Sequence, residues 1–500
     1  MMAKTTLQNC IALLGPTAAR SPGRVDIVID GKRIAAIRPA GSAPPEGTAI
    51  DATGRLVTAG LINGHQHSHE TYYKGRTDNL PLELWMNYVR PLKPIPLTPR
   101  QVYLRTMGIA IEALRSGTTT LCDDMNISPA IRPDHVAAVY QAYEDSGIRA
   151  LVGPTLFDRP FFRAVPFVDE EFPPALLAEL DAATSSGGDE LLALARELAR
   201  TRHPREHRVG YIAAPSAPQR CTEPFLRAVR ALADEFDLPL MIHVQETRLQ
   251  VVTGQLWHGK TLIDYLDGLG FLKPKTTLIH GIWLTPREIA ILARTGATVQ
   301  HNPISNLRVG SGLLPMRALL DAKVNVSLGS DGCGCADTVN MQYVLMTAAL
   351  LQKLRGDHTS WVGAQEAFLA ATMGGATAIG FGDALGAVEV GRIADLAVYR
   401  LDRVPFTPLN DPLRQLVYAE SGSSLDRVFV DGEPVMADGK LTRVDETALL
   451  DELAAEHAKL EPLIAASERD VERLLPPYER IYRRCQAIEI APDTYPARFP

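Results

Sequence analysis

The stretch Leu61-Ile62-Asn63-Gly64-His65-Gln66-His67 ends an apolar run that begins at Leu56, and this run predicts a buried strand. Side chains two residues apart on a strand point to the same face, so His65 and His67 are expected to aim at one point just past the strand's carboxyl end. Two converging neutral imidazoles supply half of a zinc-type site. A lone His-X-His pair also fits two ordinary surface or core histidines, so the prediction depends on further ligands elsewhere.

The composition favours a globular enzyme over a nucleic-acid or membrane protein. The chain has 500 residues, of which 46% are hydrophobic and 22% are charged. Its formal net charge of −7 argues against nucleic acid or an anionic membrane as the main partner. No apolar run approaches the length of a membrane span. The six scattered cysteines favour a reduced, cytoplasmic location over a disulfide framework.

Both ends of the chain carry short β patterns. Residues 25–29 and 33–37 flank Asp30-Gly31-Lys32, which is typical of a hairpin turn, and a similar pattern returns after about residue 380. Neither end is long enough to bury its own core, so we expect both to combine. The predicted organisation is a composite β-sandwich from residues 1–58 and 380–443, a central barrel over 59–379, and a C-terminal helical tail over 444–500.

The central segment alternates strand and helix patterns. Helical patterns, for example over residues 101–115, 224–235, 286–294 and 315–321, separate most of the strands. An α/β fold with a closed (β/α)8 TIM barrel is the first interpretation, and a doubly wound open sheet is the alternative. The eight candidate strands cover residues 56–62, 118–122, 149–153, 209–213, 240–244, 277–280, 298–301 and 324–328.

Three further strand ends carry metal-ligand side chains. The fifth strand carries His243 near its end and is followed by Glu246, the sixth ends in His280, and the eighth is followed by Asp331. In a barrel these tips share the carboxyl-end face with His65 and His67. Nitrogen and oxygen ligands of this kind favour zinc, with iron or another divalent metal as the alternative.

The series of motifs resembles the amidohydrolase superfamily, and within it the branch of nucleobase and nucleoside deaminases and triazine chlorohydrolases. The resemblance rests on Gly60–His67, His243-Val244-Gln245-Glu246, His280-Gly281-Ile282-Trp283-Leu284, His301-Asn302-Pro303-Ile304-Ser305-Asn306 and Gly329-Ser330-Asp331-Gly332. It implies one zinc ion per subunit, held by His65, His67, His243 and Asp331. His280 would hydrogen-bond the attacking water or complete the coordination.

The resemblance also assigns catalytic roles. A metal at this position would lower the pKa of a water molecule toward neutrality, and Asp331 could help to take its proton. Glu246 is the expected proton shuttle. The alternative is that Glu246 is a solvated loop carboxylate. His280 would stabilise the charge that develops on the substrate.

The substrate pocket is predicted from the loop after the first barrel strand and from the seventh-strand motif. The candidate substrate-binding residues are His69, Tyr72, Trp85, His301, Asn302 and Asn306. Trp85 fits an aromatic pocket wall or an ordinary core residue equally well. Lys93 stands where adenosine-type deaminases place a glutamate that grips the ribose hydroxyls, which argues against a nucleoside substrate. Cys333-Gly334-Cys335 replaces the Ser-Asn-Asn type run that usually follows the aspartate.

The sequence therefore predicts a metal-dependent hydrolase of non-peptide C–N bonds that deaminates a small nitrogen heterocycle. The alternative is the same machinery acting on an aryl urea, a carbamate or a halogenated ring, and an inactive scaffold that acts through oligomer contacts is a remote third. A homo-oligomer, dimer or tetramer, is expected from the long tail.

Overall fold

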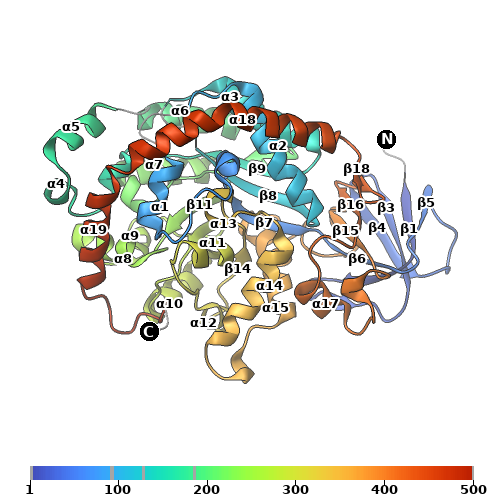
Figure 1. Cartoon of the computed structure of the whole chain (residues 1–500). Helices are drawn as coiled ribbons and strands as arrows, with labels where there is room; N and C mark the ends of the chain where they lie inside the picture. Colours follow the sequence, from blue (N-terminus) through green and yellow to red (C-terminus); the bar gives the residue numbers. More distant parts are fainter. Residues whose placement is uncertain (1–3, 91–94, 127–129, 184–186, 498–500) are drawn as a thin grey trace.

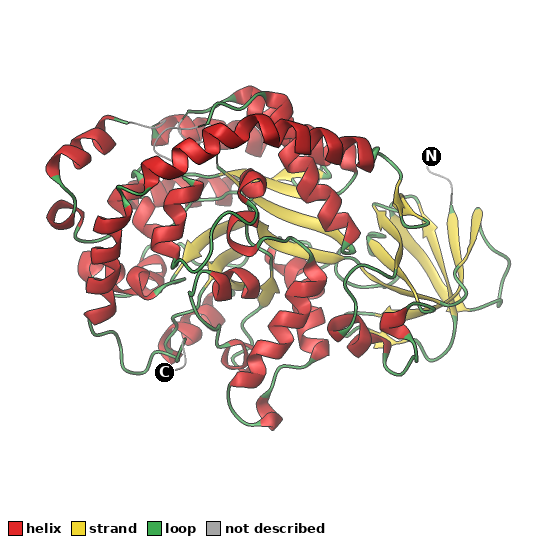
Figure 2. Ribbon diagram, in the orientation of Figure 1, coloured by secondary structure: helices red, strands yellow, loops and turns green. Residues whose placement is uncertain are grey.

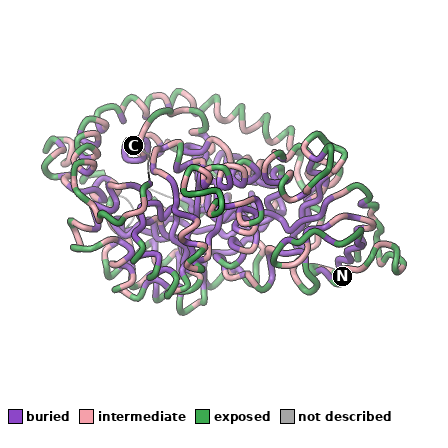
Figure 3. The backbone as a smooth tube through the Cα atoms, turned by 90° about the horizontal axis from the view of Figure 1, so that it is seen from below, coloured by how far each residue is buried: buried purple, intermediate pink, exposed green. Residues whose placement is uncertain are grey.

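Eight parallel strands and the helices around them form the larger region of the molecule, and a mixed sheet built from both chain ends stands beside it (Figure 1). The computed structural model describes residues 4–90, 95–126, 130–183 and 187–497. Helices cover the outside of the parallel strands, whereas the terminal region consists mostly of strands (Figure 2). Buried backbone is concentrated at the centre and exposed segments lie at the periphery (Figure 3).

The parallel strands are arranged in two four-stranded sheets, in the orders β10-β9-β8-β7 and β11-β12-β13-β14. The two sheets approach each other at both edges: Ala213 pairs with Leu240 in an isolated parallel bridge, and the Asp331 amide donates to the His65 carbonyl at 3.0 Å. The ladders of the described residues thus leave two seams rather than one continuous ring. The eight strands are β7 (Leu61–Gln66), β8 (Thr118–Met125), β9 (Arg149–Pro154), β10 (Val209–Tyr211), β11 (Leu240–Val244), β12 (Thr276–His280), β13 (Thr298–His301) and β14 (Val326–Leu328).

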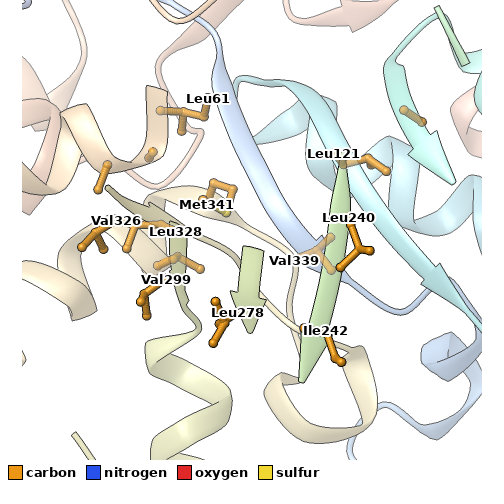
Figure 4. Close-up of a cluster of buried hydrophobic side chains, with 14 of the residues drawn as sticks. Leu61, Leu121, Leu240, Ile242, Leu278, Val299, Val326, Leu328, Val339 and Met341 are labelled. Atoms are coloured by element: carbon orange, nitrogen blue, oxygen red, sulfur yellow. The ribbon is translucent and has the colours of Figure 1, made fainter. Parts of the chain in front are cut away.

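Side chains alternate between two cores along these strands. Leu240, Ile242 and Leu278 belong to the large cluster that the helices cover (Figure 4). Met241 and Ile279, one residue out of phase, join a second cluster with Ile62, Cys122, Leu151 and Ile212. Because a strand has a period of two residues, the second cluster marks the opposite, inward face of both sheets.

The predicted helices are confirmed, with small shifts at their ends. Capping boxes begin two of them, at Thr98 with Gln101 and at Thr285 with Glu288. The principal helices are α1 (Leu82–Val89), α2 (Pro99–Arg115), α3 (Pro133–Ser146), α5 (Pro174–Ala182), α6 (Gly188–Thr201), α7 (Glu223–Glu235), α8 (Arg248–His258), α9 (Leu262–Gly268), α10 (Pro286–Thr295), α11 (Pro303–Arg308), α12 (Met316–Asp321), α14 (Met341–Leu351), α15 (Ala364–Leu369) and α17 (Pro412–Tyr418). No helix among the described residues is long and apolar enough to cross a bilayer.

The terminal strands form one ten-stranded sheet to which both chain ends contribute. Its main path is β18-β17-β16-β15-β6-β1-β3-β4, with β2 and β5 paired to β1. The strands from the N-terminal side are β1 (Thr5–Leu14), β2 (Ala19–Arg20), β3 (Val25–Asp30), β4 (Arg33–Pro39), β5 (Thr48–Asp51) and β6 (Arg55–Ala59). Those from the C-terminal side are β15 (Leu396–Arg400), β16 (Leu425–Val430), β17 (Glu433–Ala437) and β18 (Lys440–Leu441).

The prediction of a single strand over residues 56–62 is wrong. The run is divided between β6 of the terminal sheet and β7 of the parallel sheet, with Gly60 between them. A Cβ atom at Gly60 would lie 2.2 Å from Cγ2 of Thr119, so only glycine fits where the chain passes from one sheet to the other.

The tail forms two helices that lie against the larger region. In α18 (Glu446–Val471), Glu461 and Glu468 accept hydrogen bonds from the Arg76 guanidinium at 2.6 Å. Helix α19 (Leu475–Ala487) contacts α1, α8 and the short helix α4 (Val168–Glu171). The tail is therefore part of the wall above the carboxyl ends of the strands.

Candidate metal and active site

Three histidines converge at the carboxyl ends of β7 and β11. The ring centroid of His65 lies 4.6 Å from that of His67 and 4.9 Å from that of His243. One ring nitrogen from each histidine lies within 4.8 Å of the others, an arrangement that could hold a metal ion. The structure therefore brings together the histidine pair and the more distant His243 that the sequence linked.

A bulge in β7 turns the pair toward the site. Asn63 pairs with Leu121 of β8 and Gln66 with Asp123, so three residue steps along β7 lie opposite two along β8. Ile62 faces inward and Leu61 faces the helices, and strict alternation would turn His65 outward with Leu61. The extra residue reverses that phase, which directs His65 to the inward face.

Backbone carbonyls orient two of the three rings. Nδ1 of His67 lies 2.7 Å from the Asp124 carbonyl, and Nδ1 of His243 lies 2.8 Å from the Ser216 carbonyl. Since a carbonyl only accepts, each Nδ1 carries the proton and each Nε2 keeps its lone pair. Burial and the neighbouring His65 lower the pKa of His243 to about 3, so that ring is neutral at physiological pH.

Asp331 completes the cluster. Its Oδ1 lies 3.6 Å from Nε2 of His65 and 3.4 Å from Nε2 of His67, and its Oδ2 accepts a hydrogen bond from Ser305 Oγ at 2.8 Å. Burial alone would raise the pKa of Asp331, but the His65, His280 and His67 rings hold it well below the ordinary value. Its backbone φ of 66° lies in the left-handed region, which aspartate adopts more readily than most residues other than glycine.

The donor set fits a divalent metal ion. Both ring nitrogens of His65 are buried and have no hydrogen-bond partner among the described residues, which is costly unless another group contacts them. Three neutral imidazoles and one carboxylate are a zinc-type ligand set that leaves room for a water molecule. The structure thus contains a histidine-rich metal site.

His280 is oriented differently from the other histidines. The side-chain amide nitrogens of Asn306 and Asn302 lie 2.9 and 3.4 Å from its Nδ1, which therefore accepts and leaves the proton on Nε2. Nε2 lies 3.4 Å from Glu246 Oε2 and 3.8 Å from Asp331 Oδ2. A left-handed φ of 76° allows His280 to leave the outward phase of Leu278. The ring is thus a hydrogen-bond donor toward the site.

Glu246 is buried beside His280 rather than solvated. Its Oε1 accepts from Ser311 Oγ at 2.9 Å, and its backbone amide donates to Gln250 Oε1 at 2.8 Å. Burial and the negative charge of Asp331 raise the pKa of Glu246 well above the ordinary value. This shift favours the protonated carboxyl, which is the form that a proton donor needs.

The predicted substrate residues fall into three groups. Trp85 lines the cavity that contains His67, His243, Glu246, His280 and Asp331, which we call the metal cavity, and its Nε1 donates to the Gly334 carbonyl at 2.9 Å. His69 and Tyr72 line a neighbouring cavity, which we call the side cavity, between α1, α2 and the tail. His301, Asn302 and Asn306 are buried but are not among the residues that line either cavity. Asn302 and Asn306 instead contact His280.

Sequence reasoning missed two acidic residues of the metal cavity, Glu70 and Glu83. Glu70 accepts from the Gly334 amide at 3.1 Å, and burial raises its pKa to about 8. A Cβ atom on Gly332 would lie 1.9 Å from Glu70 Oε2, so the unusual glycine-containing loop after Asp331 makes room for this carboxyl. The acid directly after His69 was the available signal.

Arg90, Arg220 and Tyr478 line both cavities and were not predicted from the sequence as site residues. Arg90 follows α1, Arg220 ends a short turn of helix at Pro218–Arg220, and Tyr478 comes from α19 of the tail. Lys93, on which the argument against a nucleoside rested, lies outside the described residues.

The chain is similar to known hydrolases over nearly its whole length. The amidohydrolase family matches residues 56–435. A 5'-deoxyadenosine deaminase of Methanothermobacter thermautotrophicus is 33% identical over 90% of this chain and 98% of its own, and a 5-methylthioadenosine/S-adenosylhomocysteine deaminase of Thermococcus kodakarensis is 33% identical over 83% and 90%.

Solved structures agree with these sequence matches. A zinc-bound adenosine deaminase from Xanthomonas campestris superposes with a TM-score of 0.80 at 28% identity, over 92% of this chain and 98% of its own. A zinc complex of an atrazine chlorohydrolase from Arthrobacter aurescens, at 24% identity over 91% and 100%, shares the fold with a TM-score of 0.79. The resemblance predicted from the motifs is confirmed.

Proposed function

Because this chain belongs to the amidohydrolase family, we propose that its metal cavity deaminates a 6-aminopurine nucleoside or a close relative. The enzyme class predicted from the sequence is confirmed: the protein is a hydrolase of C–N bonds other than peptide bonds, with the metal-dependent hydrolytic deaminases as its relatives. The observation that carries the proposal is the convergence of His65, His67, His243 and Asp331 beside the buried Glu246, whose Oε2 lies 3.4 Å from Nε2 of His280.

The metal ligands would be His65, His67, His243 and Asp331, with one zinc ion per subunit. When bound, zinc supplies Lewis acidity that activates water at neutral pH. The chain itself contributes preorganisation, since the Asp124 and Ser216 carbonyls hold the rings of His67 and His243 before any ligand arrives.

Three side chains would handle protons and charge in the reaction. Asp331 is placed to accept a proton from the attacking water. Glu246 would deliver a proton to the ring nitrogen of the substrate, and the proton that Asp331 takes from water would pass to the departing amine. Glu246 would recover a proton from the hydroxyl as the carbonyl forms, so that water and the aminated ring give ammonia and the ring carbonyl. The Nε2–H of His280 would donate to the oxygen on which charge develops.

The substrate proposal draws on the relatives and on the shape of the cavity. The relatives named above act on 5'-deoxyadenosine, 5-methylthioadenosine and S-adenosylhomocysteine. Trp85 offers a flat apolar wall for a purine, and the buried acids Glu70 and Glu83 offer hydrogen-bond acceptors for hydroxyl or amino groups. Lys93, from which we expected a substrate other than a nucleoside, does not enter this proposal because it lies outside the described residues.

The test is to load the protein with zinc and to measure ammonia release from 5'-deoxyadenosine, 5-methylthioadenosine and S-adenosylhomocysteine. Glu246→Gln preserves the hydrogen-bonding shape but cannot carry the proton, so kcat should fall about 10²- to 10⁴-fold with the zinc content unchanged. His67→Ala should lose both zinc and activity. His203→Ala is the matched control, because His203 bonds the Phe236 carbonyl far from the cluster and should leave both intact.

Full activity of His67→Ala without bound metal would refute the zinc assignment. If these nucleosides release no ammonia, but an aryl urea or carbamate gives an amine and carbon dioxide or a halogenated ring gives halide, the alternative reaction would replace deamination.

We also propose the domain organisation that the sequence predicts. The two parallel sheets would close into one eight-stranded barrel over residues 59–379, since one inward core joins residues of both sheets. The terminal sheet would be the composite sandwich of residues 1–58 and 380–443, followed by the tail from 444. We also propose a cytoplasmic homo-oligomer.

A further inference from the structure

Three side chains at the junction of the two cavities each carry a buried hydrogen-bond donor that has no acceptor among the described residues. Arg90, Arg220 and Tyr478 line both the metal cavity and the side cavity. The Nε atoms of both arginines and the hydroxyl of Tyr478 are buried and make no hydrogen bond among the described residues. All three groups are donors, so what the junction lacks is an acceptor.

Arg220 is more deeply buried than Arg90, with 5% of its surface exposed. Among the described residues its side chain makes one hydrogen bond, from Nη1 to Ser216 Oγ at 3.4 Å, and its guanidinium lies 4.2 Å from the centroid of the Phe157 ring. Burial, and next the repulsion from Arg90, lower the pKa of Arg220 to about 9. The fold therefore keeps a guanidinium here with no carboxylate of the described residues within ion-pair distance, and the charge of Asp124 offsets the cost of burial only in part.

Arg90 approaches the same spot from the other side. Its guanidinium lies 5.7 Å from the centroid of the Phe161 ring, and that of Arg220 lies 5.8 Å from the same centroid. No carboxylate oxygen of the described residues lies within ion-pair distance of either arginine; Asp124 and Glu70 act on Arg90 only from farther away. Two like charges face a shared aromatic ring, and the site would be stabilised by an anion between them.

Tyr478 adds a neutral donor beside the same aromatic ring, with its own ring centroid 6.2 Å from that of Phe161. It is 1% exposed and belongs to α19, so the C-terminal tail reaches the cavity. Burial raises the pKa of Tyr478 above the ordinary range, which keeps its hydroxyl protonated and able to donate.

The junction lies close to the metal ligands. Ser216 accepts from Arg220 through its hydroxyl, and its carbonyl oxygen contacts Nδ1 of His243 at 2.8 Å. One residue thus touches both the metal ligand and the arginine. A molecule whose ring sits beside Glu246 and His280 would direct a substituent of modest length at Arg220.

We propose that Arg90, Arg220 and Tyr478 form a subsite for a carboxylate carried by the substrate. The enzyme would therefore act on heterocycles with an acidic tail in preference to their neutral analogues. This inference rests on the proposed deamination for the placement of the ring, but the subsite itself can be tested by binding.

The experiment compares S-adenosylhomocysteine, which has a carboxylate-bearing tail, with 5-methylthioadenosine, which has the same thioether and no acid. The zinc-loaded enzyme should prefer S-adenosylhomocysteine, and Arg220→Gln should lower the ratio of the two kcat/KM values about 10- to 100-fold, as expected for a lost charged hydrogen bond. Tyr478→Phe should lower that ratio less. Arg159→Gln is the matched control, because Arg159 bonds the Gln219 carbonyl next to Arg220 but does not line either cavity.

Binding separates this inference from the proposed function. Dissociation constants are measured by calorimetry on the zinc-loaded Glu246→Gln protein, with and without Arg220→Gln, for the same two compounds and for adenosine 5'-monophosphate. If neither nucleoside is deaminated but S-adenosylhomocysteine binds more tightly in an Arg220-dependent way, the subsite stands and the proposed reaction fails.

Three results would overturn the subsite. They are equal or absent binding of the two nucleosides, a preference that Arg220→Gln leaves intact, and an Arg220-dependent preference for adenosine 5'-monophosphate alone, which would assign the junction to phosphate.

Discussion

Two buried arginines in this protein have opposite surroundings. Arg149 of β9, 4% exposed, donates to both carboxylate oxygens of Asp395, at 3.1 and 3.2 Å, and to Asp431 of the terminal sheet. Arg220, 5% exposed, has only the Ser216 hydroxyl at 3.4 Å. Burial lowers the pKa of both, but the two aspartates more than reverse that effect at Arg149 and raise its pKa.

The difference separates a structural charge from a charge reserved for a ligand. At Arg149 the counter-charges belong to the chain, so the ion pairs join the parallel strands to the terminal sheet in every molecule. At Arg220 the described residues supply aromatic rings but no carboxylate within ion-pair distance, and Asp124 acts only from farther away, so a close counter-charge would have to come from a ligand. Equal burial therefore carries different consequences for stability and for binding.

The largest expected effect is on the paired arginine. Arg149→Met leaves Asp395 and Asp431 buried beside an apolar side chain, and we expect a loss of about 3 to 5 kcal/mol in the free energy of unfolding. Urea titration followed by circular dichroism measures it. The control is Arg115→Met, which removes an exposed ion pair with Glu446 and should cost less than about 1 kcal/mol. A loss at Arg149 no larger than at Arg115 would contradict the comparison.

A smaller effect is expected in acid, because Arg149, Arg208 and Lys32 act on Asp431. Burial opposes them, yet they lower the pKa of Asp431 from 3.8 to about 2. A depressed carboxyl pKa stabilises the fold above the unfolded value and loses that contribution as pH falls through the folded value. Between pH 4 and pH 2 the free energy of unfolding of the wild type should thus fall by about 2 kcal/mol more than that of Asp431→Asn. This is the energy that corresponds to the lowered pKa of Asp431.

Urea titrations at both pH values measure this difference. Parallel pH profiles for wild type and Asp431→Asn would show that the Arg149 cluster does not contribute in the assumed way.

The smallest change is expected at the unpaired arginine. Arg220→Met removes a buried charge that has no counter-ion, so the free energy of unfolding without ligand should stay the same or rise by up to about 1 kcal/mol. Thermal and urea unfolding of the zinc-loaded protein test this, with Arg149→Met as the opposite case. A loss above about 3 kcal/mol would mean that Arg220 has a structural role like that of Arg149.

The metal cluster was predictable because its signals are local. A histidine pair at the end of an apolar run, and single ligands at the ends of other strands, are visible in the one-dimensional order of residues. The parallel strands, the principal helices and the contribution of both chain ends to one sheet followed from the same periodicities. The boundary at Gly60 was missed because β6 and β7 form one uninterrupted apolar run, and only their different partners divide it.

The substrate residues were harder to predict because they depend on contacts between distant segments. Trp85 lines the metal cavity as expected, whereas Asn302 and Asn306 contact His280 instead of the cavity. Tyr478 could not be found at all from the sequence, since nothing in a tail helix indicates which cavity it will reach.

The sequence by itself determined which side chains could bind a metal, and that four of them lie at or just beyond the carboxyl ends of strands. Tertiary structure decided how they act. The bulge in β7 turns His65 inward, the left-handed backbone at His280 and Asp331 aims both side chains into the site, and carbonyl and amide partners set the histidine tautomers. Tertiary structure also left Arg220 without an acid. The reason is physical: residue type is local, whereas direction, protonation and pairing depend on atoms brought together from other parts of the chain.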